Sequence, residues 1–250
     1  MLIQSLQREC VLELKLAIRE PAFIIPTLLF PFMFYVFFGL LFGQSDSQSN
    51  NQVATYLMLT YAVFGIMGPS LFGFGANIAM ERDKGWLAIK QVSPVSALQL
   101  MFAKLSSALF FAFIIILGLF SLGVLFGGVS LSFFTFVNLL FILLLGVLPF
   151  CALGMAVGFW VNGSAAIAII NLIYLPMAFL SGLWLPITML PQWVQTLAQA
   201  LPPYHLSQLC LNVIEQGLAQ ANWIHILALV ISTAIFLAIA MLGYKRTNTK

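Results

Sequence analysis

Long apolar runs, unbroken by charge, alternate with short polar stretches along this chain. The first run, PAFIIPTLLFPFMFYVFFGLLFG, ends at the polar sequence QSDSQSNNQ, and later runs are divided by the turn sequences FGGVSLS and WVNGSA. A helix needs about 20 mainly apolar residues to cross a bilayer. We therefore expect six membrane-spanning helices, at about residues 22–43, 53–79, 105–126, 134–160, 165–186 and 223–244.

The composition supports a membrane protein. Hydrophobic residues make up 62% of the 250 residues and charged residues only 7%, whereas about 25% of a typical soluble domain is charged. Lipid must therefore cover most of the surface, and within a bilayer only helices or a closed barrel satisfy their own backbone hydrogen bonds. Because the runs lack the period-two alternation of barrel strands, we expect an all-α membrane protein with six transmembrane helices.

The distribution of the charges predicts the orientation. All ten basic residues precede the first span, lie between the second and third spans, or follow the sixth. The opposite loops carry Asp46 and Glu215 and no Lys or Arg. The positive-inside rule then places both termini in the cytoplasm, with the chain as a multi-pass protein of the cytoplasmic (inner) membrane. The net charge of +3 lies at membrane edges, so we expect no nucleic-acid partner.

Two further segments are apolar but do not have the pattern of a span. Residues 1–20 place Arg8, Lys15 and Arg19 on one helical face and apolar side chains on another, which is typical of a helix in the membrane interface. A solvated cytoplasmic lead-in is the alternative. Residues 187–217 are interrupted by prolines into pieces too short to cross, and we expect short re-entrant helices at the outer leaflet.

Motifs for catalysis or cofactor binding are missing. No G-x-x-x-x-G-K-[ST] loop for nucleotide phosphates occurs. His205 and His225 have no further ligand at metal spacing, and Cys10, Cys151 and Cys210 fall in unrelated segments. We therefore expect no catalytic residues, no metal site and no directly bound cofactor.

Two other classes of membrane protein fit less well. An intramembrane serine protease would need Gly where FLSG has Phe179, and it would need a buried histidine partner for the serine. Proton-coupled or sodium-coupled carriers usually keep ionisable residues at bilayer depth. No span carries Asp, Glu, Lys or Arg near its centre, so we expect any energy source to lie on another polypeptide.

Small residues at helical spacing predict close helix contacts. The sequences GLLFG, from Gly39 to Gly43, and GMAVG, from Gly154 to Gly158, both have the G-x-x-x-G form. We expect them to pack helices within the chain, and a dimer contact is the alternative.

Two longer motifs resemble the type-2 permease subunits of ATP-binding-cassette exporters. The sequence MERDKGWLAIKQVSPVSALQLMFAK is similar to that family's loop after the second span, and FLSGLWLPITMLPQWVQTLAQALPPYHLSQL to the end of its fifth span. In the first motif the matching residues are Glu81, Arg82, Gly85, Pro94, Ser96 and Lys104. In the second they are Ser181, Gly182, Pro186, Leu190, Pro191, Trp193, Leu201, Pro202 and Tyr204. The resemblance covers essentially the whole chain.

The resemblance implies a partner for the cytoplasmic segment at residues 80–102. In such exporters two permease subunits, identical or paralogous, lie on two ATPase subunits that bind ATP and Mg²⁺. The docking residues that it implies here are Glu81, Arg82, Lys84, Trp86, Leu87 and Pro94. Apolar anchors with flanking charges suit such an interface. Without the resemblance, an ordinary basic loop that sets the topology would explain the segment.

The resemblance also implies a substrate path between permease subunits, lined by the second and fifth spans and gated outside. The residues assigned to this path and gate are Asn77, Asn171, Tyr174, Ser181, Pro186 and Trp193. Short outer loops favour export of an amphipathic or lipid-linked molecule such as a drug, a lipid or a glycan. A gradient-independent channel or a membrane scaffold without an ATPase partner is the alternative.

Overall fold

A computed structural model of the protein describes residues 2–41, 49–85, 97–218 and 220–248. These residues form helices joined by short turns, and none of them forms a strand. The expected all-α fold class is confirmed. Backbone hydrogen bonds are thus satisfied within each segment, as a lipid environment requires.

Three of the six expected spans are built from more than one helical piece. Helix α2 (Pro21–Phe34) continues as the π-helix η1 (Tyr35–Leu41). The second rod joins α3 (Ser49–Leu71), the π-helix η2 (Phe72–Ala76) and α4 (Asn77–Asp83). The third is α6 (Ala97–Phe126), and the fourth joins α7 (Phe133–Leu145) to α8 (Val147–Trp160). The last two are α9 (Gly163–Leu180) and α12 (Asn222–Asn248).

Length and composition identify the membrane-crossing segments among the described residues. Five helices are long and apolar enough to cross a bilayer, at residues 52–83, 98–126, 133–160, 163–180 and 222–246. The segment Ile25–Leu40, in the first expected span, is apolar but shorter. Helix α6 begins at Ala97, before the expected start at residue 105, so that Lys104 lies inside the helix.

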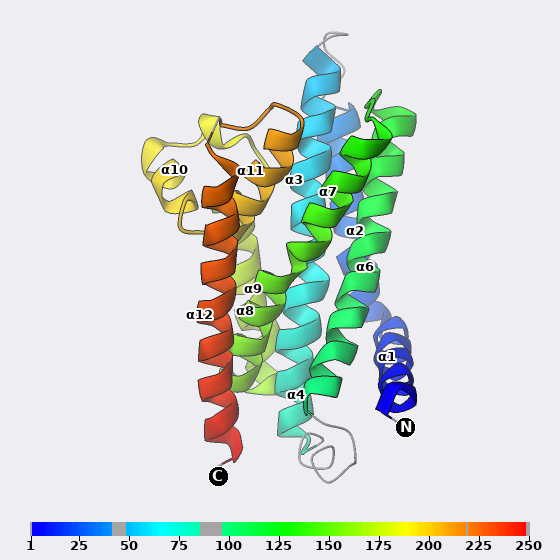
Figure 1. The fold of residues 1–250 in the computed structure, drawn as a ribbon, viewed down its shortest axis with the longest axis vertical. Helices are drawn as coiled ribbons and strands as arrows, with labels where there is room; N and C mark the ends of the chain where they lie inside the picture. Colours follow the sequence, from blue (N-terminus) through cyan, green and yellow to red (C-terminus); the bar gives the residue numbers. More distant parts are fainter. Residues whose placement is uncertain (1, 42–48, 86–96, 219, 249–250) are drawn as a thin grey trace.

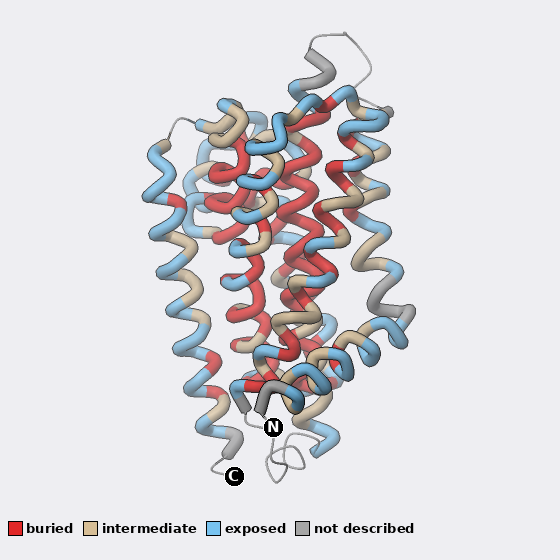
Figure 2. The backbone as a smooth tube through the Cα atoms, turned by 45° about the vertical axis from the view of Figure 1, so that its right-hand side comes forward, coloured by how far each residue is buried: buried red, intermediate tan, exposed pale blue. Residues whose placement is uncertain are grey.

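The rods lie side by side, and both chain termini lie at the same end of the bundle, called here the terminal end (Figure 1). Helix α1 (Leu2–Ile18) lies across this end and turns into α2 at the edge of the bundle (Figures 1 and 2). The opposite end carries the short helices η3 (Ile187–Met189), α10 (Gln192–Ala198) and α11 (Pro202–Val213).

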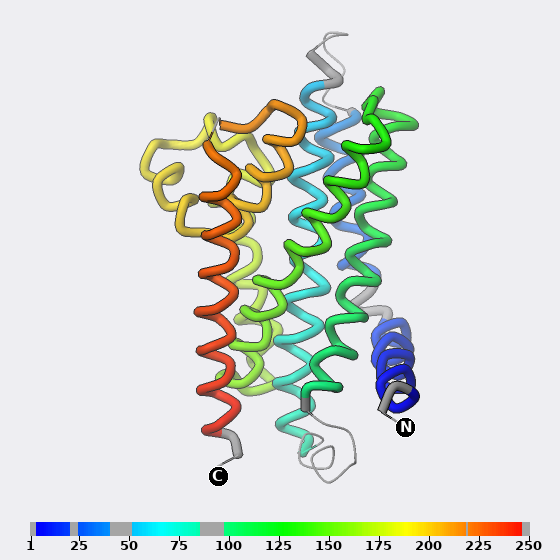
Figure 3. The backbone as a smooth tube through the Cα atoms, viewed as in Figure 1, coloured from blue at the N-terminus to red at the C-terminus, as the bar shows by residue number. Residues whose placement is uncertain are grey.

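Helix α3 occupies the centre of the bundle and α12 lies at its edge. The tube in Figure 3 shows α3 among neighbours on several sides, whereas α12 packs mainly on α8 and α11. The membrane-crossing window of the α3–α4 rod is 89% buried and that of α12 only 17%. A helix that is apolar all round can be buried by protein or exposed to lipid, and the two helices represent these two cases.

The glycines of GMAVG bring α8 against the α3–η2 rod. A Cβ atom added at Gly154 would lie 2.9 Å from the carbonyl oxygen of Leu71, and one added at Gly158 would lie 2.9 Å from that of Gly75. Only glycine permits so close an approach of two backbones. In GLLFG, an added Cβ at Gly39 would instead meet Tyr35 of the preceding helical turn, and Gly43 lies outside the described residues.

Candidate functional site

A buried lysine joins three helices at the terminal end. Lys104 of α6 is only 4% exposed, and its Nζ lies 3.1 Å from Oε2 of Glu13 on α1 and 2.8 Å from Oε1 of Glu81 on α4. Glu13 is 6% exposed. We call these three residues the charged junction. Removing one partner from such a buried group leaves an uncompensated charge, so the ion pairs hold α1, α4 and α6 in register.

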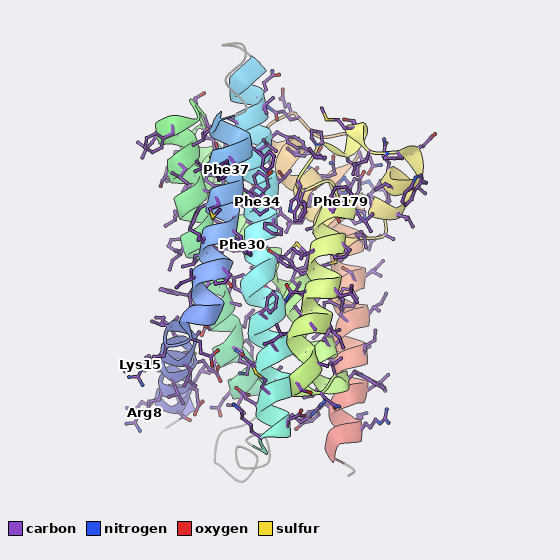
Figure 4. The ribbon with its side chains drawn as sticks, turned by 180° about the vertical axis from the view of Figure 1, so that it is seen from behind. Arg8, Lys15, Phe30, Phe34, Phe37 and Phe179 are labelled. Carbon is purple, nitrogen blue, oxygen red and sulfur yellow. The ribbon has the colours of Figure 1, made fainter. Side chains whose placement is uncertain are left out.

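Helix α1 directs an acidic side chain toward the bundle and its basic side chains away from it. Glu13 faces inward to Lys104, whereas Arg8 and Lys15 point away from the bundle (Figure 4). Arg8, Lys15 and Arg19 are exposed, and so are the apolar side chains of Val11 and Ile18. An outer surface with both basic and apolar side chains is typical of a helix at a membrane interface.

Arg82 and Asp83, which follow Glu81, form hydrogen bonds with the backbone on both sides of the turn between α8 and α9. The guanidinium of Arg82 donates hydrogen bonds to the carbonyl oxygens of Phe159 (2.6 Å), Val161 (2.9 Å) and Gly158 (3.3 Å). These carbonyls lie at the C-terminal end of α8, where helical donors are lacking and positive charge is favourable. Oδ2 of Asp83 accepts a hydrogen bond from the backbone N–H of Gly163, the first residue of α9, at 2.7 Å.

The end of α4 is therefore tied to four other helices. Glu81 connects it to α6 and, through Lys104, to α1, while Arg82 and Asp83 connect it to α8 and α9. Lys84, the next residue, is exposed. Among the residues assigned to docking, Trp86, Leu87 and Pro94 lie outside the described residues. A displacement of the segment that follows α4 would reach four helices through named side-chain contacts.

Aromatic side chains lie between α2, α3 and α9, in the half of the bundle away from the terminal end. The rings of Phe64 and Tyr174 stack with centroids 4.8 Å apart, and the Tyr174 hydroxyl donates to the carbonyl oxygen of Phe64 at 3.1 Å. Phe34 stacks on Trp184 at 5.5 Å and also contacts Phe64. We call these four residues the aromatic face. Figure 4 shows Phe30, Phe34, Phe37 and Phe179 on this side of the molecule.

The residues assigned to a substrate path fall into two separate regions. Tyr174 lies in the aromatic face, and buried Ser181 caps the nearby end of α9. Asn171 is exposed and donates to the Ile167 carbonyl oxygen of its own helix. By contrast, Asn77 lines a cavity beside the charged junction.

The remaining two residues of this assignment lie at the end opposite the termini. Pro186 is half-buried and precedes η3, and Trp193 projects from α10 with 63% of its surface exposed. Both belong to the segment of short helices at this end and lie away from the charged junction, which belongs to the terminal end.

Two histidines that lie 20 positions apart meet at this opposite end. The Nδ1 atoms of His205 on α11 and His225 on α12 are 2.9 Å apart, and Nε2 of His205 lies 2.8 Å from the carbonyl oxygen of Gln199. The sequence offers no spacing signal for this pair, because the partners lie on different helices. Among the described residues, no group of three or more His, Cys, Asp or Glu side chains could hold a metal ion.

The fold and these contacts define a multi-pass helical membrane protein whose charged contacts gather at the end that carries the termini. The family model of the ABC-2 type transporter matches residues 6–214, and the chain belongs to this family. The chain is 28% identical over 235 residues to the transport permease YvfS of Bacillus subtilis (strain 168), covering 94% of this chain and 95% of that protein. It is therefore the permease subunit of a transporter.

Proposed function

We propose that the protein is the transmembrane subunit of an ATP-driven exporter that moves an amphipathic or lipid-linked substrate outward. The observation that carries the proposal is the set of contacts made by Glu81, Arg82 and Asp83. Three consecutive side chains join one helix end to α1, α6, α8 and α9. A partner that binds the segment after α4 could therefore move several spans together.

In this proposal the partner is a cytoplasmic ATP-binding-cassette ATPase that carries ATP and Mg²⁺. The terminal end faces the cytoplasm, so both termini lie on that side of the cytoplasmic (inner) membrane. Trp86 and Leu87 would anchor the segment on the ATPase, since large apolar side chains dominate such interfaces. Arg82 and Glu81, whose side chains are engaged within the chain, would pass the displacement to the spans rather than touch the partner.

A second permease copy or a paralogue would complete the substrate path. The side chains of Phe30, Phe37 and Phe179 stay exposed beside the aromatic face. A path between two such surfaces would be apolar and would suit an amphipathic substrate. ATP binding would shift the pair of subunits between inward-open and outward-open arrangements. The short helices that carry Trp193 and flank Pro186 would gate the outer exit.

Affinity purification of the tagged chain from native membranes in mild detergent tests the proposal, with the amount of co-purifying ATPase as the readout. We expect an ATPase with the unmodified chain and its loss with Trp86→Ala. Trp193→Ala is the matched control, because this exposed tryptophan lies at the opposite end, and it should retain the ATPase. Recovery of the unmodified chain without any ATPase, together with ion conduction in planar bilayers, would favour a channel.

A further inference from the structure

A cavity of about 220 Å³ lies beside the charged junction, between α1, the α3–η2–α4 rod and α6. Its apolar wall includes Leu12 and Leu16 of α1 and Phe111 of α6. Leu12 and Leu16 are 45% and 46% exposed. Apolar side chains of the cavity lining therefore reach the surface that the interfacial helix presents to lipid.

The lining of the cavity is also charged, with more carboxylates than ammonium groups among the described residues. Its ionisable side chains are Glu13, Glu20, Glu81, Lys84 and Lys104. Glu81 uses Oε1 to bind Lys104, whereas its Oε2 is buried and has no hydrogen-bond partner within the described part of the chain. A buried carboxylate oxygen without a donor is unfavourable, and a ligand that supplies an N–H donor and positive charge would complete the site.

The backbone of the α3–η2–α4 rod leaves room for such a ligand. Pro69 and Gly73 line the same cavity, and a Cβ atom added at Gly73 would meet nothing within 4 Å. Gly73 belongs to the π-helix η2, and π-helical segments occur frequently at functional sites. The open space at Gly73 is independent of the charges, so shape and electrostatics point to the same place.

We propose that this cavity binds the ammonium group of a cationic amphipath that enters from the lipid. The ammonium donates to Oε2 of Glu81, and the apolar chain of the ligand lies along Leu12, Leu16 and Phe111. This inference rests on the proposed function and adds a substrate class to it. The ammonium can belong to a free amphipathic amine or to the headgroup of an aminophospholipid, since both join an ammonium to apolar chains.

Equilibrium binding of radiolabelled dodecylamine to the full chain in a nonionic detergent tests the proposal, with dodecanol as the uncharged probe. We expect saturable binding of dodecylamine near one molecule per chain and no saturable binding of dodecanol. Gly73→Leu, which fills the cavity without changing a charge, should weaken dodecylamine binding at least tenfold. Glu81→Gln should weaken it similarly, and Glu215→Gln, which removes an exposed carboxylate at the opposite end, should leave it unchanged.

Because Glu81→Gln also alters the pairing of Lys104, Gly73→Leu decides the outcome, provided that it elutes and unfolds like the unmodified chain. Equal binding by Gly73→Leu and the unmodified chain, or saturable binding of dodecanol, would overturn the proposal. Phosphatidylethanolamine that co-purifies with the unmodified chain and is lost in Gly73→Leu would identify the lipid as the source of the ammonium.

The binding test of this site and the co-purification test of the proposed function can fail independently of each other. Saturable dodecylamine binding by a chain that never co-purifies with an ATPase would retain the site and remove the exporter. Co-purification of an ATPase with a chain that shows no saturable binding would retain the exporter and remove the site.

Discussion

The ammonium of Lys104 lies 2.8 Å from Oε1 of Glu81 and joins α6 to α4 at a position that is only 4% exposed. Lys104→Met would leave Glu13 and Glu81 close together without their shared cation. Breaking a buried ion pair in this way costs about 3–5 kcal/mol. We expect Lys104→Met to lower the free energy of unfolding by that order, measured by denaturant titration of the purified chain in detergent. Lys15→Met, at an exposed position of α1, should change it by less than about 0.5 kcal/mol.

Arg82 should not be replaceable by lysine. Its planar guanidinium reaches three carbonyl oxygens at the C-terminal end of α8, and a single ammonium cannot reproduce that fork. Hydrogen bonds to charged groups contribute about 1.5–3 kcal/mol, and we expect Arg82→Lys to lose an amount of that order in the same titration. Arg19→Lys, at the exposed position directly after α1, is the matched control. Equal stability of the two variants would show that these contacts do not hold α8.

Alanine should be tolerated at Gly73 and not at Gly154 or Gly158. At the latter two positions the added methyl group would lie 2.9 Å from backbone oxygen atoms, which cannot turn aside as a side chain can. Overpacking of this kind costs about 1–3 kcal/mol. At Gly73 the methyl group meets nothing, and alanine favours a helix over glycine by about 1 kcal/mol. Thermal unfolding of the three variants in parallel measures the difference, and similar midpoints would refute the close α8–α3 contact.

The pair of His205 and His225 should make the contact between α11 and α12 sensitive to acid. The Gln199 carbonyl oxygen can only accept, so Nε2 of His205 carries a proton. In neutral His205, Nδ1 is then an acceptor for Nδ1–H of His225. Nε2 of His225 is buried and has no partner among the described residues. A further proton on the pair would therefore occupy Nε2 of His225, where no described residue accepts its hydrogen bond.

The sign of the pH effect follows from His205. Burial lowers the pKa of His205, so the folded state favours its neutral form. The unfolded chain takes up protons near the ordinary pKa of about 6.5, and stability should fall as the pH falls below that value.

Tyr204, whose pKa burial raises, contacts both rings and keeps its proton between pH 7.5 and pH 5. Comparison of unfolding at pH 7.5 and pH 5 with that of His225→Gln gives the contribution of the pair. Identical pH dependence in the two chains would contradict the prediction.

The sequence by itself determined which segments are helical and that they lie in lipid. Apolar runs of about 20 residues have to become helices there, because only a helix satisfies its backbone within a single segment. The sequence GMAVG likewise identified a close helix contact, since glycine at that spacing presents bare backbone along one side of a helix. The resemblance also singled out Glu81, Arg82 and Lys104 as motif residues.

Only the tertiary structure decided which partners these residues have. Lys104 meets Glu13 across 91 positions of the chain, and Arg82 meets the end of α8 across 77. Asn77 faces the cavity beside the charged junction instead of the aromatic face that holds Tyr174. Periodicity tells which face of a helix is polar, but the helix that covers this face is set by packing among all the spans. Partner identity is therefore a property of the packed bundle, and no single segment encodes it.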